Sequence, residues 1–69
     1  MSSTSPVGKT GRVTSGGAIP AGGGQLGEVM VEGQAYFALS SEGEAIPAHT
    51  RVLVVDLSPP RTVVVTPLY

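Results

Sequence analysis

The stretch "LGEVMVEGQAYFAL" (residues 26–39) decides the fold of this chain. Its first half alternates two kinds of side chain, which predicts a half-buried β-strand over residues 26–32. Val29 and Val31 share one face of this strand, and Glu28, Met30 and Glu32 share the other. Gly33 follows and favours a tight turn before a second strand over residues 35–39. The stretch is therefore expected to fold as an antiparallel hairpin.

Short β-branched runs separated by Gly and Pro lie on both sides of the hairpin. They predict three further strands, over residues 8–14, 51–57 and 61–66. The first of these bends at residues 15–17 and resumes at residues 18–19, because glycine inside a strand indicates a bend or bulge. The intervening residues are expected to form loops and turns: 20–24, 40–48 and 58–60. No window has unbroken helical spacing of apolar residues, so no helix is predicted.

Five short strands and no helix favour an all-β fold, a small five-stranded closed barrel. An open sheet of this size would leave one face of its valines in water. The runs "VLVV" (residues 52–55) and "VVV" (residues 63–65) place apolar side chains at consecutive positions. Either both faces are partly covered there, or a bulge shifts the alternation.

Composition limits the chain to one small domain without covalent or metal cross-links. The 69 residues include no cysteine, and His49 is the single histidine, so neither a disulfide nor a structural zinc site is expected. Residues 1–6 are predicted to be a flexible lead-in and residues 7–69 the folded domain. No segment approaches the roughly 20 apolar residues of a membrane span, and no secretory signal pattern is present, which predicts a soluble domain.

Charge argues against nucleic-acid binding. The formal net charge is −1, whereas phosphate contacts require a concentrated positive patch. The four basic residues are dispersed along the chain: Lys9, Arg12, Arg51 and Arg61.

Two glycine motifs resemble nucleotide-binding signals. Gly8-Lys9-Thr10 lacks the glycine five residues earlier and the following helix of a phosphate-binding loop. Residues 22–27 match G-x-G-x-x-G but lead into a strand, and the chain has no room for a βαβ unit. Both motifs are interpreted as turn chemistry, the second as a flexible loop, and no cofactor is predicted.

The sequence signals for a catalytic site are as weak as those for a nucleotide-binding site. His49, a serine and Asp56 could be written as a triad, but a triad is defined by geometry. Glu42 and Glu44 flank a loop glycine and are interpreted as solvated side chains. The sequence predicts no enzyme and no metal site.

Adjacent aromatic residues provide the best candidate contacts. Tyr36 and Phe37 could form a stacking platform, but strand alternation sends one ring into the barrel. The following residue, Ala38, is expected to face the crowded interior. The predicted partner-contact residues are Tyr36, Phe37, Arg12 and Arg51.

The order of these elements resembles the C-terminal domain of the NfeD family, in its short, membrane-anchored form, over most of the chain. Four short motifs carry the resemblance: Gly8-x-x-Gly11, Gly27-Glu28-Val29, the aromatic-x-Ala of Tyr36 to Ala38, and a Val-x-Val-x-Pro ending at Pro67. A further segment runs from Ile46 to Val52, where His49 replaces the usual family glycine. The first loop is also longer and richer in glycine than is usual in the family.

The resemblance implies an OB-fold barrel from a plasma-membrane protein anchored by N-terminal helices, with the domain facing the cytoplasm. It further implies a non-enzymatic protein-interaction domain that associates with stomatin- or flotillin-type scaffolds or with another copy of itself. Longer members add a serine protease domain, which nothing here matches, and the family is implicated in membrane organisation and membrane protease regulation. The alternative hypothesis is an OB-fold binder of single-stranded nucleic acid or oligosaccharide. That alternative requires Tyr36 or Phe37 exposed beside Lys9, Arg12 or Arg51.

Overall fold

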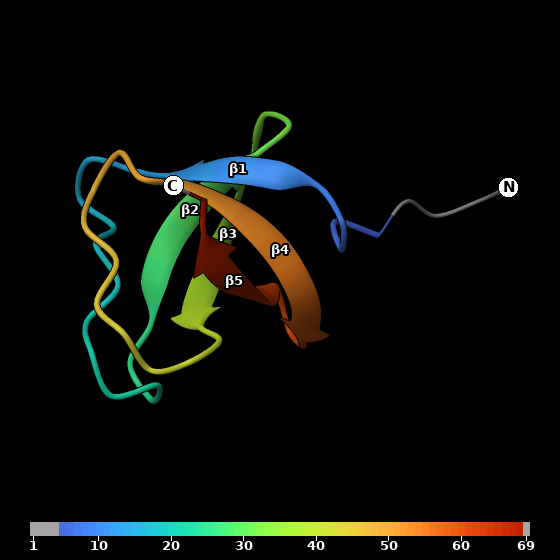
Figure 1. Cartoon of the computed structure of the whole chain (residues 1–69). Coiled ribbons are helices and arrows are strands. Elements are labelled where there is room, and N and C mark those ends of the chain that lie inside the picture. Colours follow the sequence, from blue (N-terminus) through green and yellow to red (C-terminus); the bar gives the residue numbers. More distant parts are fainter. Residues whose placement is uncertain (1–4, 69) are drawn as a thin grey trace, which may run out of the picture.

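A computed structural model describes residues 5–68, and all regular structure in that range is β-strand. The strands are β1 (Thr10–Val13), β2 (Gly27–Val31), β3 (Gln34–Ser40), β4 (Arg51–Ser58) and β5 (Thr62–Pro67). They close into a barrel in the order β1-β2-β3-β5-β4 (Figure 1), which confirms the predicted fold class. All neighbouring strands are antiparallel except the parallel pair β3–β5. No helix capable of crossing a membrane occurs within residues 5–68.

The predicted hairpin is confirmed, and β3 is one residue longer at each end than the predicted strand over residues 35–39. Val31 pairs with Gln34, so the turn has only two residues between its strands. Both of them, Glu32 and Gly33, have positive φ, at 51° and 83°. Two left-handed residues define the type I′ turn, whose twist matches that of the flanking strands.

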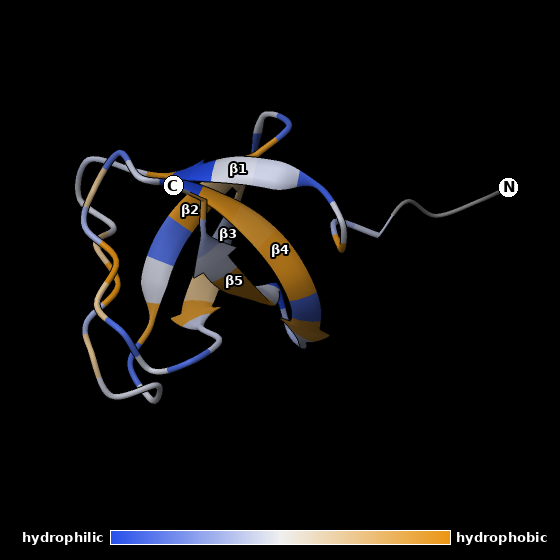
Figure 2. Cartoon of the chain, viewed as in Figure 1, coloured by the Kyte–Doolittle hydropathy of each residue, from blue (hydrophilic) through white to orange (hydrophobic). Residues whose placement is uncertain are grey.

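The β4–β5 pairing explains the consecutive valines. Its register shifts between Val54 and Asp56, so Val55 is the extra, unpaired residue of a bulge; it points outward and is 41% exposed. Leu53 and Val64 also lie on the outer face and are half-buried. Both alternatives from the sequence therefore apply, a bulge and partial cover of the outer face. Figure 2 shows the resulting contrast between strongly hydrophobic β4 and the pale β1.

The core is small and consists mostly of valine. Its buried members are Val13, Ile19, Val29, Val31, Ala38, Ile46, Val52, Val54, Val63 and Val65. The expected inward position of Ala38 is confirmed, since none of its surface is exposed. Each buried aliphatic side chain stabilises the fold by about 1.5–3 kcal/mol before entropy is counted.

The first strand is shorter than expected, and the prediction that it resumes at Ala18–Ile19 is wrong. Ile19 pairs instead with Ile46 through two backbone hydrogen bonds of 2.8 and 2.9 Å. The tripeptide Ala-Ile-Pro occurs twice, at residues 18–20 and 45–47, and the two copies form this bridge. Both isoleucines are 1% exposed and close one end of the barrel, where the two long loops lie side by side (Figure 1).

The glycine-rich loop is anchored at a second point as well. The amide of Gly22 donates to the carbonyl of Gly43 at 2.8 Å. At the end of this loop, a Cβ on Gly27 would collide with the carbonyl oxygen of Gly17 and with the side chain of Ile19. Glycine at residue 27 therefore lets the loop pack directly against the start of β2.

Candidate functional site

The two adjacent aromatic residues point in different directions, as strand alternation predicted. Tyr36 is half-buried and packs against the core, and its hydroxyl donates to Oε1 of Gln34 at 3.4 Å. Phe37 points outward and remains 52% exposed. Only Phe37 therefore presents a largely free ring.

The basic candidate residues do not surround Phe37. Its cross-strand neighbours are Glu28 on β2 and Thr62 on β5. Arg12 and Arg51 pair with each other across β1 and β4. The four residues predicted to contact a partner therefore do not form one surface. Tyr36 packs against the core, Phe37 points outward from β3, and the arginine pair lies on β1 and β4.

Lys9 lies near the other ring but already has a partner. It lines one end of the barrel together with Tyr36, and its ammonium group is 3.4 Å from the Glu32 carboxylate. The combination of a free aromatic ring with a free cation, which the nucleic-acid hypothesis requires, does not occur at these five positions.

Apolar side chains that are exposed or half-buried form a band that we call the apolar stripe. It consists of Leu26, Phe37, Leu39, Val64 and Val55. Register places its members on adjoining strands, since Leu39 of β3 is opposite Val64 of β5. Leu26 and Leu39 are the residues next to the paired Gly27 and Ala38. Leu26 and Phe37 are the most exposed, at 52% each.

Three shallow grooves lie elsewhere on the surface. Two flank Tyr36 and Pro6 at one end of the barrel, with volumes of about 330 and 210 Å³. The third, of about 400 Å³, lies over the Ile19–Ile46 bridge and is lined by both Ala-Ile-Pro segments. The last groove is apolar and shallow, and it contains no side chain that could perform chemistry.

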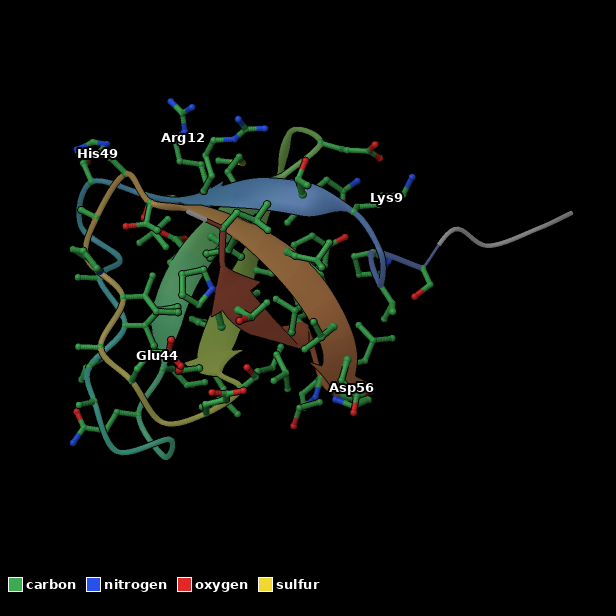
Figure 3. The ribbon with its side chains drawn as sticks, in the orientation of Figure 1. Lys9, Arg12, Glu44, His49 and Asp56 are labelled. Carbon is green, nitrogen blue, oxygen red and sulfur yellow. The ribbon has the colours of Figure 1, made fainter. Side chains whose placement is uncertain are left out.

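The titratable residues considered for catalysis are far apart. Figure 3 shows His49 and Asp56 on opposite sides of the barrel, with Glu44 on a third side. Within residues 5–68, no group of three or more His, Cys, Asp or Glu side chains gathers to hold a metal ion. The geometry therefore provides no triad from these residues.

A five-stranded closed barrel with this strand order and one parallel pair, β3–β5, defines an OB-fold-like small barrel. Two solved structures share it. The C-terminal domain of stomatin operon partner protein 1510-C from Pyrococcus horikoshii has a TM-score of 0.76 and 23% identity, covering 93% of this chain and 89% of that one. The soluble domain of the NfeD protein YuaF from Bacillus subtilis has a TM-score of 0.73 and 34% identity, covering 87% of this chain and 70% of that one.

The chain belongs to the NfeD C-terminal domain family, whose model matches residues 10–66. A search among curated proteins finds no match to the chain. The division into a lead-in over residues 1–6 and a domain over residues 7–69 stays a prediction, because most of the lead-in lies outside the described residues.

Residue 49, where the family resemblance predicts glycine, has a backbone conformation that favours glycine. His49 has a φ of 70°, in the left-handed region that glycine adopts without steric cost. Its backbone amide donates to the carbonyl of Val13 at 2.8 Å, which fixes the turn before β4.

Sequence reasoning missed the bridge between the long loops. The repeated Ala-Ile-Pro tripeptide was the available signal, because two isoleucines in otherwise polar, glycine-rich loops need a place to bury. A repeat of three residues does not reveal pairing, however, until the barrel places both loops at the same end.

Proposed function

We propose that this chain is a non-enzymatic protein-interaction domain of a membrane-anchored NfeD-type protein, and that the apolar stripe is its docking surface. The observation that carries the proposal is the exposure of Phe37 on the outer face of β3. An exposed aromatic ring beside other apolar side chains loses contact with water when a partner covers it. Aromatic residues at the centre of an interface often dominate its affinity.

The surroundings of Phe37 fit the centre of such an interface. Half-buried Leu39 and Val64 extend the apolar surface on one side. Glu28 and Thr62 lie opposite the ring on the neighbouring strands and provide polar groups at its edge. An apolar centre with a polar rim is the usual anatomy of a protein interface.

The partner that we propose is a stomatin- or flotillin-type scaffold protein, with a second copy of this chain as a further contact. The support is that a protein of the same fold, 1510-C, is described as a stomatin operon partner. We place the domain on the cytoplasmic face of the plasma membrane, where it takes part in membrane organisation or in regulation of a membrane protease.

The test is a binding titration by calorimetry between this chain and a purified stomatin-type protein. Phe37→Ser is expected to weaken binding at least about tenfold, as loss of a hot-spot aromatic does. Val7→Ser is the matched control, because Val7 is 42% exposed and lies outside the stripe. Equal binding by wild type and Phe37→Ser, or no binding by wild type, would contradict the proposal.

The alternative is an OB-fold binder of single-stranded nucleic acid or oligosaccharide, which the exposed Phe37 ring favours. Glu28 opposite the ring repels a phosphate backbone, and no basic residue occupies the paired positions. Fluorescence anisotropy with labelled oligonucleotides and oligosaccharides distinguishes the two. Binding that Phe37→Ser abolishes, in the absence of any protein partner, would favour the alternative.

A further inference from the structure

Two arginines face each other on the wall of the barrel, and neither forms a salt bridge with an acidic side chain among residues 5–68. Arg12 of β1 pairs with Arg51 of β4, and both side chains are exposed. The residues that follow them, Val13 and Val52, point into the core, so both guanidinium groups lie on the outer face. Like charges directly opposite each other on a sheet destabilise the pairing, and an anionic ligand would relieve this repulsion.

Among residues 5–68, the acidic side chains on the segment that pairs with β1 have other hydrogen-bond or salt-bridge partners. Met30 of β2 lies opposite Arg12, and the acidic residues two positions from Met30 are Glu28 on β2 and Glu32 in the turn that follows β2. The Thr14 hydroxyl donates to Glu28 at 3.0 Å, and the Lys9 ammonium group pairs with Glu32 at 3.4 Å. That pair is the single salt bridge found within residues 5–68.

Exposed apolar side chains flank the arginine pair. Met30 is 42% exposed beside Arg12. Leu68 is 38% exposed, and its amide donates to the carbonyl of Arg51 at 2.8 Å. We call Arg12, Arg51, Met30 and Leu68 the arginine corner. Figure 3 shows Arg12 on the side of the barrel away from Glu44 and Asp56, so the positive charge is local although the net charge is negative.

We propose that the arginine corner contacts the anionic phospholipid headgroups of a membrane. Guanidinium groups bind phosphate oxygens in a two-pronged geometry, and the apolar flanks suit the boundary between headgroups and acyl chains. Neither arginine lines any of the three grooves, so the corner suits an extended surface better than an enclosed anion or peptide. The inference rests on the membrane anchoring proposed above but not on the protein partner.

The affinity of the arginine corner for headgroups is weak when the chain is free in solution. The contact becomes populated only when the parent protein is anchored in the same membrane. Each arginine near an anionic surface strengthens binding about fivefold. Anchoring of the parent protein raises the local concentration of headgroups, so that a weak contact becomes populated. The corner would then orient the barrel on the membrane and leave the apolar stripe free for its partner.

The experiment is a titration of the ¹⁵N-labelled chain, observed by amide NMR at low ionic strength, with two kinds of bicelle. One contains phosphatidylcholine alone, and the other contains about one third phosphatidylglycerol, a negative surface of cellular type. Shifts are expected at Arg12, Arg51 and Leu68 with the anionic bicelles only. Arg12→Gln and Arg51→Gln should each weaken the apparent affinity about fivefold. Arg61→Gln, in the β4–β5 turn, should leave it unchanged.

Several results would overturn the inference. Equal shifts with soluble glycerol phosphate would indicate a free-anion site, and equal shifts with both bicelles would remove the role of charge. An equal response of Arg61→Gln would indicate non-specific attraction, and no shifts at all would exclude contact. Concentration-dependent shifts without lipid would show that the corner meets a second copy. Phe37→Ser should leave the lipid titration unchanged, because Phe37 lies outside the arginine corner. Lipid binding and protein docking are therefore tested independently of each other.

Discussion

Replacing His49 by glycine should stabilise the domain. The residue has a φ of 70°, which costs a residue with a side chain about 1–2 kcal/mol. Glycine removes this cost, but it also increases the conformational entropy of the unfolded chain, which lowers the free energy of unfolding by about 0.5–1 kcal/mol. The midpoints of these two ranges predict a net gain of about 0.75 kcal/mol for His49→Gly, or roughly 3–6 °C in Tm for a domain of this size.

Little opposes this gain, because the histidine side chain contributes little to the fold. It is exposed and makes no side-chain hydrogen bond to another described residue. The structural contact of residue 49 is the backbone hydrogen bond to Val13, which glycine retains.

The assay is urea unfolding followed by circular dichroism, with thermal melts in parallel. His49→Ala is the matched control, because it removes the imidazole but keeps the Cβ that makes the backbone costly. It should unfold within about 0.5 kcal/mol of wild type. An equal gain from alanine and glycine would assign the effect to the side chain, and no gain from glycine would refute the backbone argument.

Three further substitutions test the packing, each by urea unfolding. Ala38→Leu should destabilise the barrel by about 1–3 kcal/mol through overpacking, whereas Ala35→Leu on the outer face should change it by less than about 0.5 kcal/mol; an unchanged melt for Ala38→Leu would show that the β3 register is wrong. Gly27→Ala should lower the free energy of unfolding by about 1–3 kcal/mol. Gly24→Ala should lower it by less than about 0.5 kcal/mol, because a Cβ there meets no neighbouring atom. Equal effects of the two substitutions would contradict the close approach of the loop to the start of β2. Ile19→Ala should cost about 2–5 kcal/mol and speed hydrogen exchange of the isoleucine amide opposite it, and unchanged exchange would mean that the loop bridge is independent of this side chain.

The sequence predicted the strands well, because their signals are local. Alternation in β2 and the Glu32–Gly33 turn determine the hairpin without any knowledge of the rest of the chain. The bulge at Val55 was one of two alternatives and could not be selected, since it depends on how β5 pairs with β4.

The loops and the site were harder to predict, because both depend on distant segments. The Ile19–Ile46 bridge joins residues that only barrel closure brings together. Strand alternation could show that one of Tyr36 and Phe37 points outward. It could not show that Arg12 and Arg51 are partners across a seam, because β1 and β4 lie far apart in sequence.

Docking of a protein partner on the apolar stripe is the central proposal for this domain. The most direct measurement is cross-saturation NMR of the labelled chain bound to the stomatin-type protein proposed as its partner. The account predicts that saturation transfers to the amides of Leu26, Phe37 and Leu39. Transfer confined to the groove over the Ala-Ile-Pro bridge, or to the grooves beside Tyr36, would contradict it.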